Sequence, residues 1–199
     1  RPTIRSHHGD DVVDDYEWLR AKDDPDVIAH LEAENAYTDE RTAHLASLRQ
    51  RIFEEIKGRT LETDLSVPTR QGAWWYYGRT VEGKQYGIHC RAPLAADDDW
   101  TPPTLTPGVD VPGEVVLLDG NVEADGHEFF SLGTFYVSSD GARLLYGIDN
   151  EGDGRYTLRI RDLETGEDLT DVIPDTSAGA CFSPDGRFVY TASRDGWVE

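Results

Sequence analysis

An internal repeat restricts the fold of this chain more than any other feature of the sequence. Residues 137–146 recur as residues 182–190, and the Asp-Gly pairs of the two copies lie about 45 residues apart. Each copy reads as a strand, a Ser-x-Asp-Gly turn and an apolar strand that ends in Tyr. Two more strands are expected between the copies, at 156–161 and 168–173. Four short strands per repeat are typical of a β-propeller blade, and a sandwich or another meander is the alternative.

The N-terminal part of the chain has a helical pattern instead. Residues 1–23 are polar and are expected to be irregular. Asp24 and Pro25 suit the cap and first position of a helix over 25–37, and Thr38 offers a second helix start. The clearest helical feature is an apolar stripe that ends near Gly58 and needs a partner surface. Its members are Leu45, Leu48, Ile52, Phe53 and Ile56.

Strand patterns take over after residue 63. An aromatic strand is expected at 73–79, a hairpin turn at 81–84, a return strand at 85–91 and a further strand at 114–119. The proline-rich stretch 93–113 reads as a loop inserted between strands.

We therefore predict a mainly β chain with an N-terminal helical segment at 1–63 and an incomplete β-propeller at 64–199. A closed propeller needs at least four blades of about 40–45 residues, and the strand region has room for two to three. We expect the sequence to be the N-terminal piece of a larger protein.

The charge of the chain excludes some classes of partner. The formal net charge is −20 and the isoelectric point is near 4.5, which argues against binding to nucleic acids or to anionic membrane surfaces. No run of about 18 apolar residues is present, so no membrane span is expected. Cys90 and Cys181 lie in strand-like runs and read as buried free thiols, which favours a reducing, cytoplasmic location.

The sequence offers no nucleophile in a recognisable setting. The nucleophile of an α/β-hydrolase lies in Gly-x-Ser-x-Gly on a sharp turn. Ser131 and Ser177 each have a glycine two residues later, but Phe129 and Asp175 occupy the position two residues before. We predict that this chain contains no catalytic residue.

Three other motifs have a functional and a structural interpretation, and we favour the structural one each time. The run 7–11, with His7 and His8, resembles a metal cluster but lacks further ligands at a useful spacing. The run 149–154 begins like a calcium loop, yet Ile160 stands where a bidentate Glu is required. The aromatic run 74–77 is a possible binding platform, but alternating core packing explains it better. We expect no metal site and no cofactor.

Several stretches together resemble the prolyl oligopeptidase family of serine peptidases, and within it the oligopeptidase B branch. The similarity covers nearly the whole chain, although none of the stretches is a catalytic motif. They are residues 8–10, 13–20, 31–38, 53–59, 62–68, 75–77, 82–86 and 152–159.

The resemblance implies a seven-bladed propeller joined to an α/β-hydrolase domain that is absent from this sequence. It implies that the N-terminal helical segment packs on that domain. It also implies hydrolysis of short peptides by a Ser-Asp-His triad, cleavage after Lys or Arg, and a propeller that limits substrate access. On this view the 199 residues alone are inactive, and their partners are short basic peptides and the hydrolase domain.

Two other functions stay open at this point. Propeller blades also serve as non-catalytic interaction modules, and a related peptidase with proline specificity fits the same resemblance. The acidic charge fits steering of basic peptides, but we favour a simple solvated surface.

Overall fold

The structure, a computed structural model, describes residues 1–96 and 98–193 and divides the chain into two compact units. They are Arg1–Thr60 and Leu61–Glu199, and each is described by itself. The division lies close to the predicted boundary at residue 63, but the independence of the two parts as domains stays a prediction. No helix in the described ranges is long and apolar enough to cross a membrane.

The first unit opens with a hairpin that the sequence analysis missed. β1 (Thr3–His7) and β2 (Asp10–Asp14) pair antiparallel, so the expectation of an irregular stretch over residues 1–23 was wrong. His8 and Gly9 form the turn with φ values of 50° and 89°. Two positive φ values are the requirement of the tight hairpin turn whose twist matches that of the strands. His is tolerated there less often than Asn or Gly, which is why the signal is weak.

A short 3₁₀ turn, η1 (Glu17–Arg20), comes next and is followed by two helices. The helices are α1 (Pro25–Thr42) and α2 (Ala46–Arg59), and a second 3₁₀ turn, η2 (Ala43–Leu45), links them. The Asp24 carboxylate accepts the Asp26 amide at 2.9 Å, and Pro25 is the first helical residue, as predicted. The second helix start expected at Thr38 was wrong, because α1 continues to Thr42. The threonine hydroxyl of Thr42 instead bonds back to the Thr38 carbonyl inside the same helix.

The first unit has almost no core of its own. Val27 is its only buried residue, whereas the apolar stripe is exposed, from 36% at Leu45 to 61% at Ile56. A helix with an apolar face gains most of its stability from packing that face against a partner. The stripe therefore exists as predicted, and nothing within this unit covers it.

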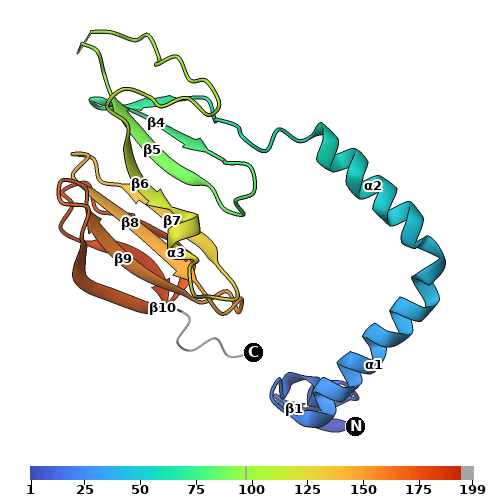
Figure 1. Cartoon of the computed structure of the whole chain (residues 1–199). Helices are drawn as coiled ribbons and strands as arrows, with labels where there is room; N and C mark the ends of the chain where they lie inside the picture. The colour runs from blue at the N-terminus through green and yellow to red at the C-terminus, as the bar shows by residue number, and fades with distance from the viewer. Residues whose placement is uncertain (97, 194–199) are drawn as a thin grey trace. The chain divides into compact units, whose positions relative to one another are not determined.

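The described residues of the second unit form two antiparallel sheets (Figure 1). The first has the order β3-β4-β5-β6, with bounds Thr69–Gln71, Trp74–Arg79, Ile88–Pro93 and Val115–Asp119. A single helical turn, α3 (Gly120–Glu123), leads to the second sheet. That sheet has the order β7-β8-β9-β10-β11, with bounds Ser131–Val137, Arg143–Asp149, Tyr156–Asp162, Asp168–Phe182 and Val189–Ser193.

The repeat corresponds to two equivalent hairpin turns. Ser138 and Ser183 each donate a hydroxyl hydrogen bond of 2.6 Å to the aspartate two residues later. The glycines that follow, Gly141 and Gly186, have φ of 71° and 68°. The first turn joins β7 to β8 and the second joins β10 to β11, so the two copies begin successive blade-like hairpins.

β10 is longer than the sequence suggested. The expected strand ended at Ile173, but β10 runs on to Phe182 with breaks in its register. Asp175 has φ of 55°, and Thr176 pairs with Tyr156 on one side and Ser193 on the other. β10 thus completes a group of four strands with β7, β8 and β9, and its C-terminal part also pairs with β11, which follows the second repeat turn.

The core is divided into layers by the sheets. One cluster, between the first and second sheets, is built from Leu117, Leu118, Leu144, Tyr146 and Leu163. The other face of the first sheet packs Tyr77, Ile88 and Cys90 beneath Leu105 and Val111 of the proline-rich loop. This layering of short antiparallel sheets confirms a mainly β chain with one helical segment.

Candidate functional site

The two serines with a partial nucleophile pattern lie in strands. Ser131 is the first residue of β7, and its Oγ is 3.3 Å from the Tyr156 hydroxyl. Ser177 lies within β10. Neither occupies the strand-to-helix turn that exposes an α/β-hydrolase nucleophile.

The two metal motifs have structural roles in turns. His8 lies in the β1–β2 turn, where its ring meets that of His7 edge to face at 4.4 Å. The Asp149 carboxylate accepts the backbone amides of Glu151, Gly152 and Gly154 at 2.8, 2.8 and 2.9 Å. Those amides lower the pKa of Asp149 against the opposing effect of burial. Within the described ranges, no group of three or more His, Cys, Asp or Glu side chains is arranged to hold a metal ion.

The aromatic run is divided between the two faces of β4. Trp75 and Tyr77 are buried on one face, and Trp74 and Tyr76 lie half-buried on the other. Tyr77 packs in the layer under the proline-rich loop, whereas Tyr76 packs between the sheets. Alternating packing explains this run, because four rings on two faces do not make one binding platform.

An ionic cluster that sequence reasoning missed ties the residue that follows the proline-rich loop, Glu114, to the first sheet. The Glu114 carboxylate accepts the Tyr77 hydroxyl at 2.7 Å and pairs with Arg79 at 3.0 Å. Burial and the hydrogen bond to Glu114 raise the pKa of Tyr77. Burial also raises the pKa of the neighbouring Cys90 thiol to about 11, so this thiol stays protonated and unreactive.

A second cluster joins the two sheets. Arg161 on β9 pairs with Asp168 at 2.8 Å and with Glu123 of α3 at 2.9 Å. The Tyr146 hydroxyl donates to the same Asp168 at 2.5 Å. Every charge in this cluster faces an opposite one, which is typical of a structural network, and we assign it no chemistry.

His89 is the titratable side chain whose surroundings differ most from these satisfied clusters. It lies on β5, directly opposite Gly78 of β4, so both residues face the same side of the first sheet. Its ring stacks on Phe135 of β7 at 4.4 Å between centroids. No described residue hydrogen-bonds to its ring nitrogens. Burial lowers the pKa of His89, so at neutral pH the ring is uncharged and offers one donor and one acceptor.

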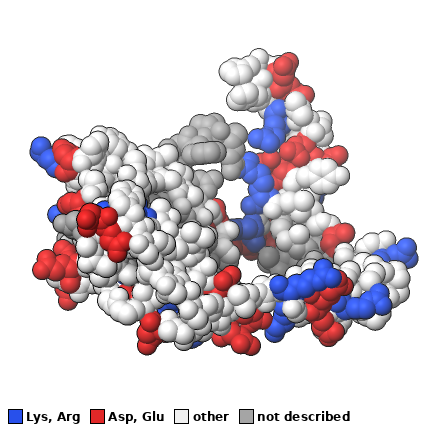
Figure 2. Space-filling view, turned by 90° about the horizontal axis from the view of Figure 1, so that it is seen from above, with Lys and Arg blue, Asp and Glu red and all other residues white. Residues whose placement is uncertain are grey.

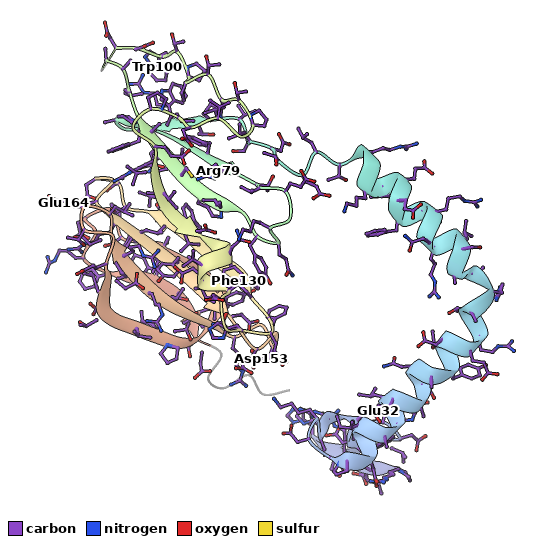
Figure 3. All side chains as sticks on the ribbon, viewed as in Figure 1. Glu32, Arg79, Trp100, Phe130, Asp153 and Glu164 are labelled. Carbon is purple, nitrogen blue, oxygen red and sulfur yellow. The ribbon has the colours of Figure 1, made fainter. Side chains whose placement is uncertain are left out.

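Two hollows flank His89. The larger, of about 410 Å³, lies over Gly78 and is lined mainly by apolar groups, among them Leu65 and Ile88. The smaller, of about 270 Å³, lies towards Gly120 and the start of β7. Arg79 and Phe130, labelled in Figure 3, line the larger and the smaller hollow respectively. An uncharged imidazole between two recesses is the best candidate for ligand contact in the described part of the chain.

Sequence reasoning did not single out His89. The available signal was a glycine inside an otherwise aromatic strand, which often marks a place where another group approaches closely. That signal carries no information about which histidine lies across the sheet.

Comparison with known proteins identifies the family. Residues 1–195 match the family described as prolyl oligopeptidase, N-terminal beta-propeller domain. Among curated proteins, the chain is 35% identical over 195 residues to a dipeptidyl aminopeptidase BI from Pseudoxanthomonas mexicana, covering 96% of this chain and 27% of that protein. It is 35% identical over 167 residues to Protease 2 from Moraxella lacunata, covering 84% of this chain and 23% of that protein.

Solved structures agree with this match. Oligopeptidase B from Leishmania major superimposes with a TM-score of 0.81 at 26% identity, over 98% of this chain and 28% of that one. Oligopeptidase B from Trypanosoma brucei gives a TM-score of 0.78 at 27% identity, over the same shares of the two chains. The chain spans about a quarter of the length of the curated relatives it matches. The two sheets are therefore the first blades of a propeller, and the chain belongs to the prolyl oligopeptidase family, as its N-terminal portion.

Proposed function

We propose that the full-length protein is a serine oligopeptidase that hydrolyses short peptides after Lys or Arg. The observation that carries this proposal is the similarity to two oligopeptidase B structures over 98% of the chain, the better with a TM-score of 0.81. In this proposal the propeller limits access to peptides of small size. The catalytic triad belongs to an α/β-hydrolase domain outside this sequence, on which the apolar stripe of residues 45–56 packs.

The surface charge is consistent with basic substrates. In the view of Figure 2, acidic side chains outnumber basic ones over the sheet unit, whereas the helices carry both signs. A negative field raises the encounter rate of cationic peptides, and salt screens it. Cleavage of an Arg peptide is therefore expected to slow as the salt concentration rises, more than cleavage of a neutral peptide.

A second candidate activity comes from the relative named dipeptidyl aminopeptidase, which shares 35% identity over 195 residues. Such an enzyme needs a free amino terminus on its substrate, whereas an oligopeptidase accepts a blocked one. A proline-specific oligopeptidase is the third possibility, and a non-catalytic interaction module is the fourth.

One experiment separates these candidates. The full-length protein is assayed with three chromogenic reporters, namely a blocked peptide ending in Arg, a blocked peptide ending in Pro, and an unblocked dipeptide. We expect the blocked Arg reporter to give the highest kcat/KM. A higher value for the Pro or the unblocked reporter would replace our proposal with the corresponding activity, and no turnover of any reporter would favour the interaction module.

We further propose that residues 1–199 alone are inactive and that the protein works in the cytoplasm. Support for the location comes from the two free thiols, Cys90 and Cys181, which are typical of a reducing compartment. The purified 199-residue chain is expected to give no turnover of the Arg reporter. Labelling of one of its serines by a serine-directed inhibitor, together with turnover, would contradict this.

A further inference from the structure

Gly78 is a glycine that the fold does not explain. It lies inside β4, and its φ is outside the left-handed region that favours glycine. A Cβ built on it meets only the Ile88 carbonyl oxygen at 3.8 Å and the Ser66 hydroxyl at 4.0 Å, which are ordinary contacts. Glycine in a strand costs about 0.5–1 kcal/mol relative to alanine. Neither backbone conformation nor packing offsets that cost here.

Two other strand glycines, Gly133 and Gly147, do have a structural reason, because a side chain there would clash with a neighbour. A Cβ on Gly133 would clash with the ring of Tyr156, and one on Gly147 would lie 2.8 Å from the Leu158 side chain. Those glycines are required by close packing within the sheet. At Gly78 the corresponding space is the hollow of about 410 Å³, which is within the size range of ligand pockets.

His89 provides the polar part of the same site. Its ring is held by stacking on Phe135, and its nitrogens have no partner among the described residues. A donor and an acceptor on one rigid ring match the carbonyl and N–H groups of a peptide bond. Hollows on both sides of that ring match the side chains that flank a peptide bond in an extended segment.

We propose that the surface formed by Gly78, His89 and the two flanking hollows is a docking subsite for an extended peptide. In this subsite a peptide amide contacts the His89 imidazole, and an apolar side chain or the aliphatic stem of a long one lies over Gly78. The proposal rests on the proposed function, since it gives the propeller a direct part in holding the substrate. It places that contact on β4 and β5.

The test measures peptide binding rather than turnover. The full-length protein is treated with a small serine-directed reagent to prevent cleavage, and a fluorescein-labelled eight-residue peptide with one central Arg is titrated by anisotropy. We expect Gly78→Val to raise the Kd at least tenfold, Gly78→Ala to raise it less, and His89→Phe to raise it about fivefold. The matched control is Gly179→Val on β10, where a Cβ meets nothing within 4 Å, and it is expected to bind normally.

Two results would overturn the proposal. One is a Kd within twofold of the parent value for Gly78→Val. The other is a lower melting temperature for Gly78→Ala than for the parent, because that would mean another part of the full-length chain fills the hollow. This binding test and the reporter assay can fail separately. If none of the three reporters is cleaved, the anisotropy measurement still reports peptide binding, and if a reporter is cleaved normally, Gly78 need not contact the peptide.

Discussion

Gly147 on β8 provides a quantitative test of the packing between strands. A Cβ added there would lie 2.8 Å from Leu158 Cδ2 and 3.3 Å from Thr134 Cβ. Leu158 is 1% exposed, and Thr134 is fixed by a hydrogen bond of 2.6 Å from its hydroxyl to the Ala178 carbonyl. Ordinary contact therefore requires a shift of about 0.6 Å by side chains that are themselves buried.

Gly147→Ala is expected to destabilise this sheet by about 1–2 kcal/mol. Overpacking costs about 1–3 kcal/mol, and the loss of chain entropy in the unfolded state offsets about 0.4–1 kcal/mol of it. A change of 1.4 kcal/mol is tenfold in an equilibrium constant. Where opening of the sheet controls exchange, amide hydrogens of β8 and β9 in the full-length protein should therefore exchange about tenfold faster.

Native-state hydrogen exchange read by mass spectrometry measures this change strand by strand. The control is Gly179→Ala on β10, which makes the same substitution where a Cβ meets no neighbour, and it should slow exchange slightly or leave it unchanged. Exchange of β8 that is unchanged or slower in Gly147→Ala would refute the reasoning, because it would mean that the core accommodates the methyl group without strain.

Three further predictions concern the buried polar groups. Tyr146→Phe removes the hydroxyl that donates to Asp168 at 2.5 Å and should cost about 1–3 kcal/mol, measured as a lower denaturant midpoint; an unchanged midpoint would mean that the bond contributes nothing net. Glu114→Gln removes the charge that pairs with Arg79 at 3.0 Å, and limited proteolysis should then cut the proline-rich loop several-fold faster, whereas equal rates would argue against a clamp. Burial raises the pKa of the Cys90 thiol to about 11, so the protonated thiol contributes its full stabilisation of the fold below the ordinary pKa near 9, and this stabilisation is lost as the pH rises towards 11. A Cys90→Ala variant should therefore lose less stability than the parent between pH 9 and 11, and identical losses would contradict the assignment.

The repeat was predictable because its signal is local. Ser138, Asp140 and Gly141 lie within four residues, and the turn they form depends on their own side chains and φ values. The same holds for Asp24 and Pro25 at the start of α1. Local chemistry of this kind can be read from one copy and confirmed by the second.

The errors have a common physical origin in backbone conformations that the residue type only permits. His8 adopts φ of 50° and Asp175 adopts φ of 55°, and each permits a strand arrangement that the pattern did not indicate. At His8 the result is an unforeseen hairpin, and at Asp175 it is a strand that continues for nine residues beyond Ile173 to Phe182. Because Asn or Gly fills such positions more often, a histidine or aspartate there gives little warning.

The candidate site was not predictable for a different reason. His89 meets Gly78 through the register of two strands, and it meets Phe135 through the packing of two sheets. Both relations depend on residues far apart in the sequence. A one-residue change of register would turn the histidine to the opposite face, so the sequence pattern alone does not fix its neighbours.

The glycines of the second unit show how a structure can distinguish residues that the fold requires from residues that indicate a function, although the sequence has the same residue type at each position. Gly141 is needed for a positive φ, and Gly147 is needed because Leu158 leaves no room for a methyl group. Only the first reason is visible in a sequence, since turn chemistry is local and packing is not. Gly78 has neither reason, yet it faces a hollow beside His89, whose ring nitrogens have no hydrogen-bond partner among residues 1–96 and 98–193. Gly179 on β10 also has neither reason, so the glycine alone does not mark a site. The hollow and the imidazole beside Gly78 are what point to a bound group, and the peptide is the occupant whose groups match that surface.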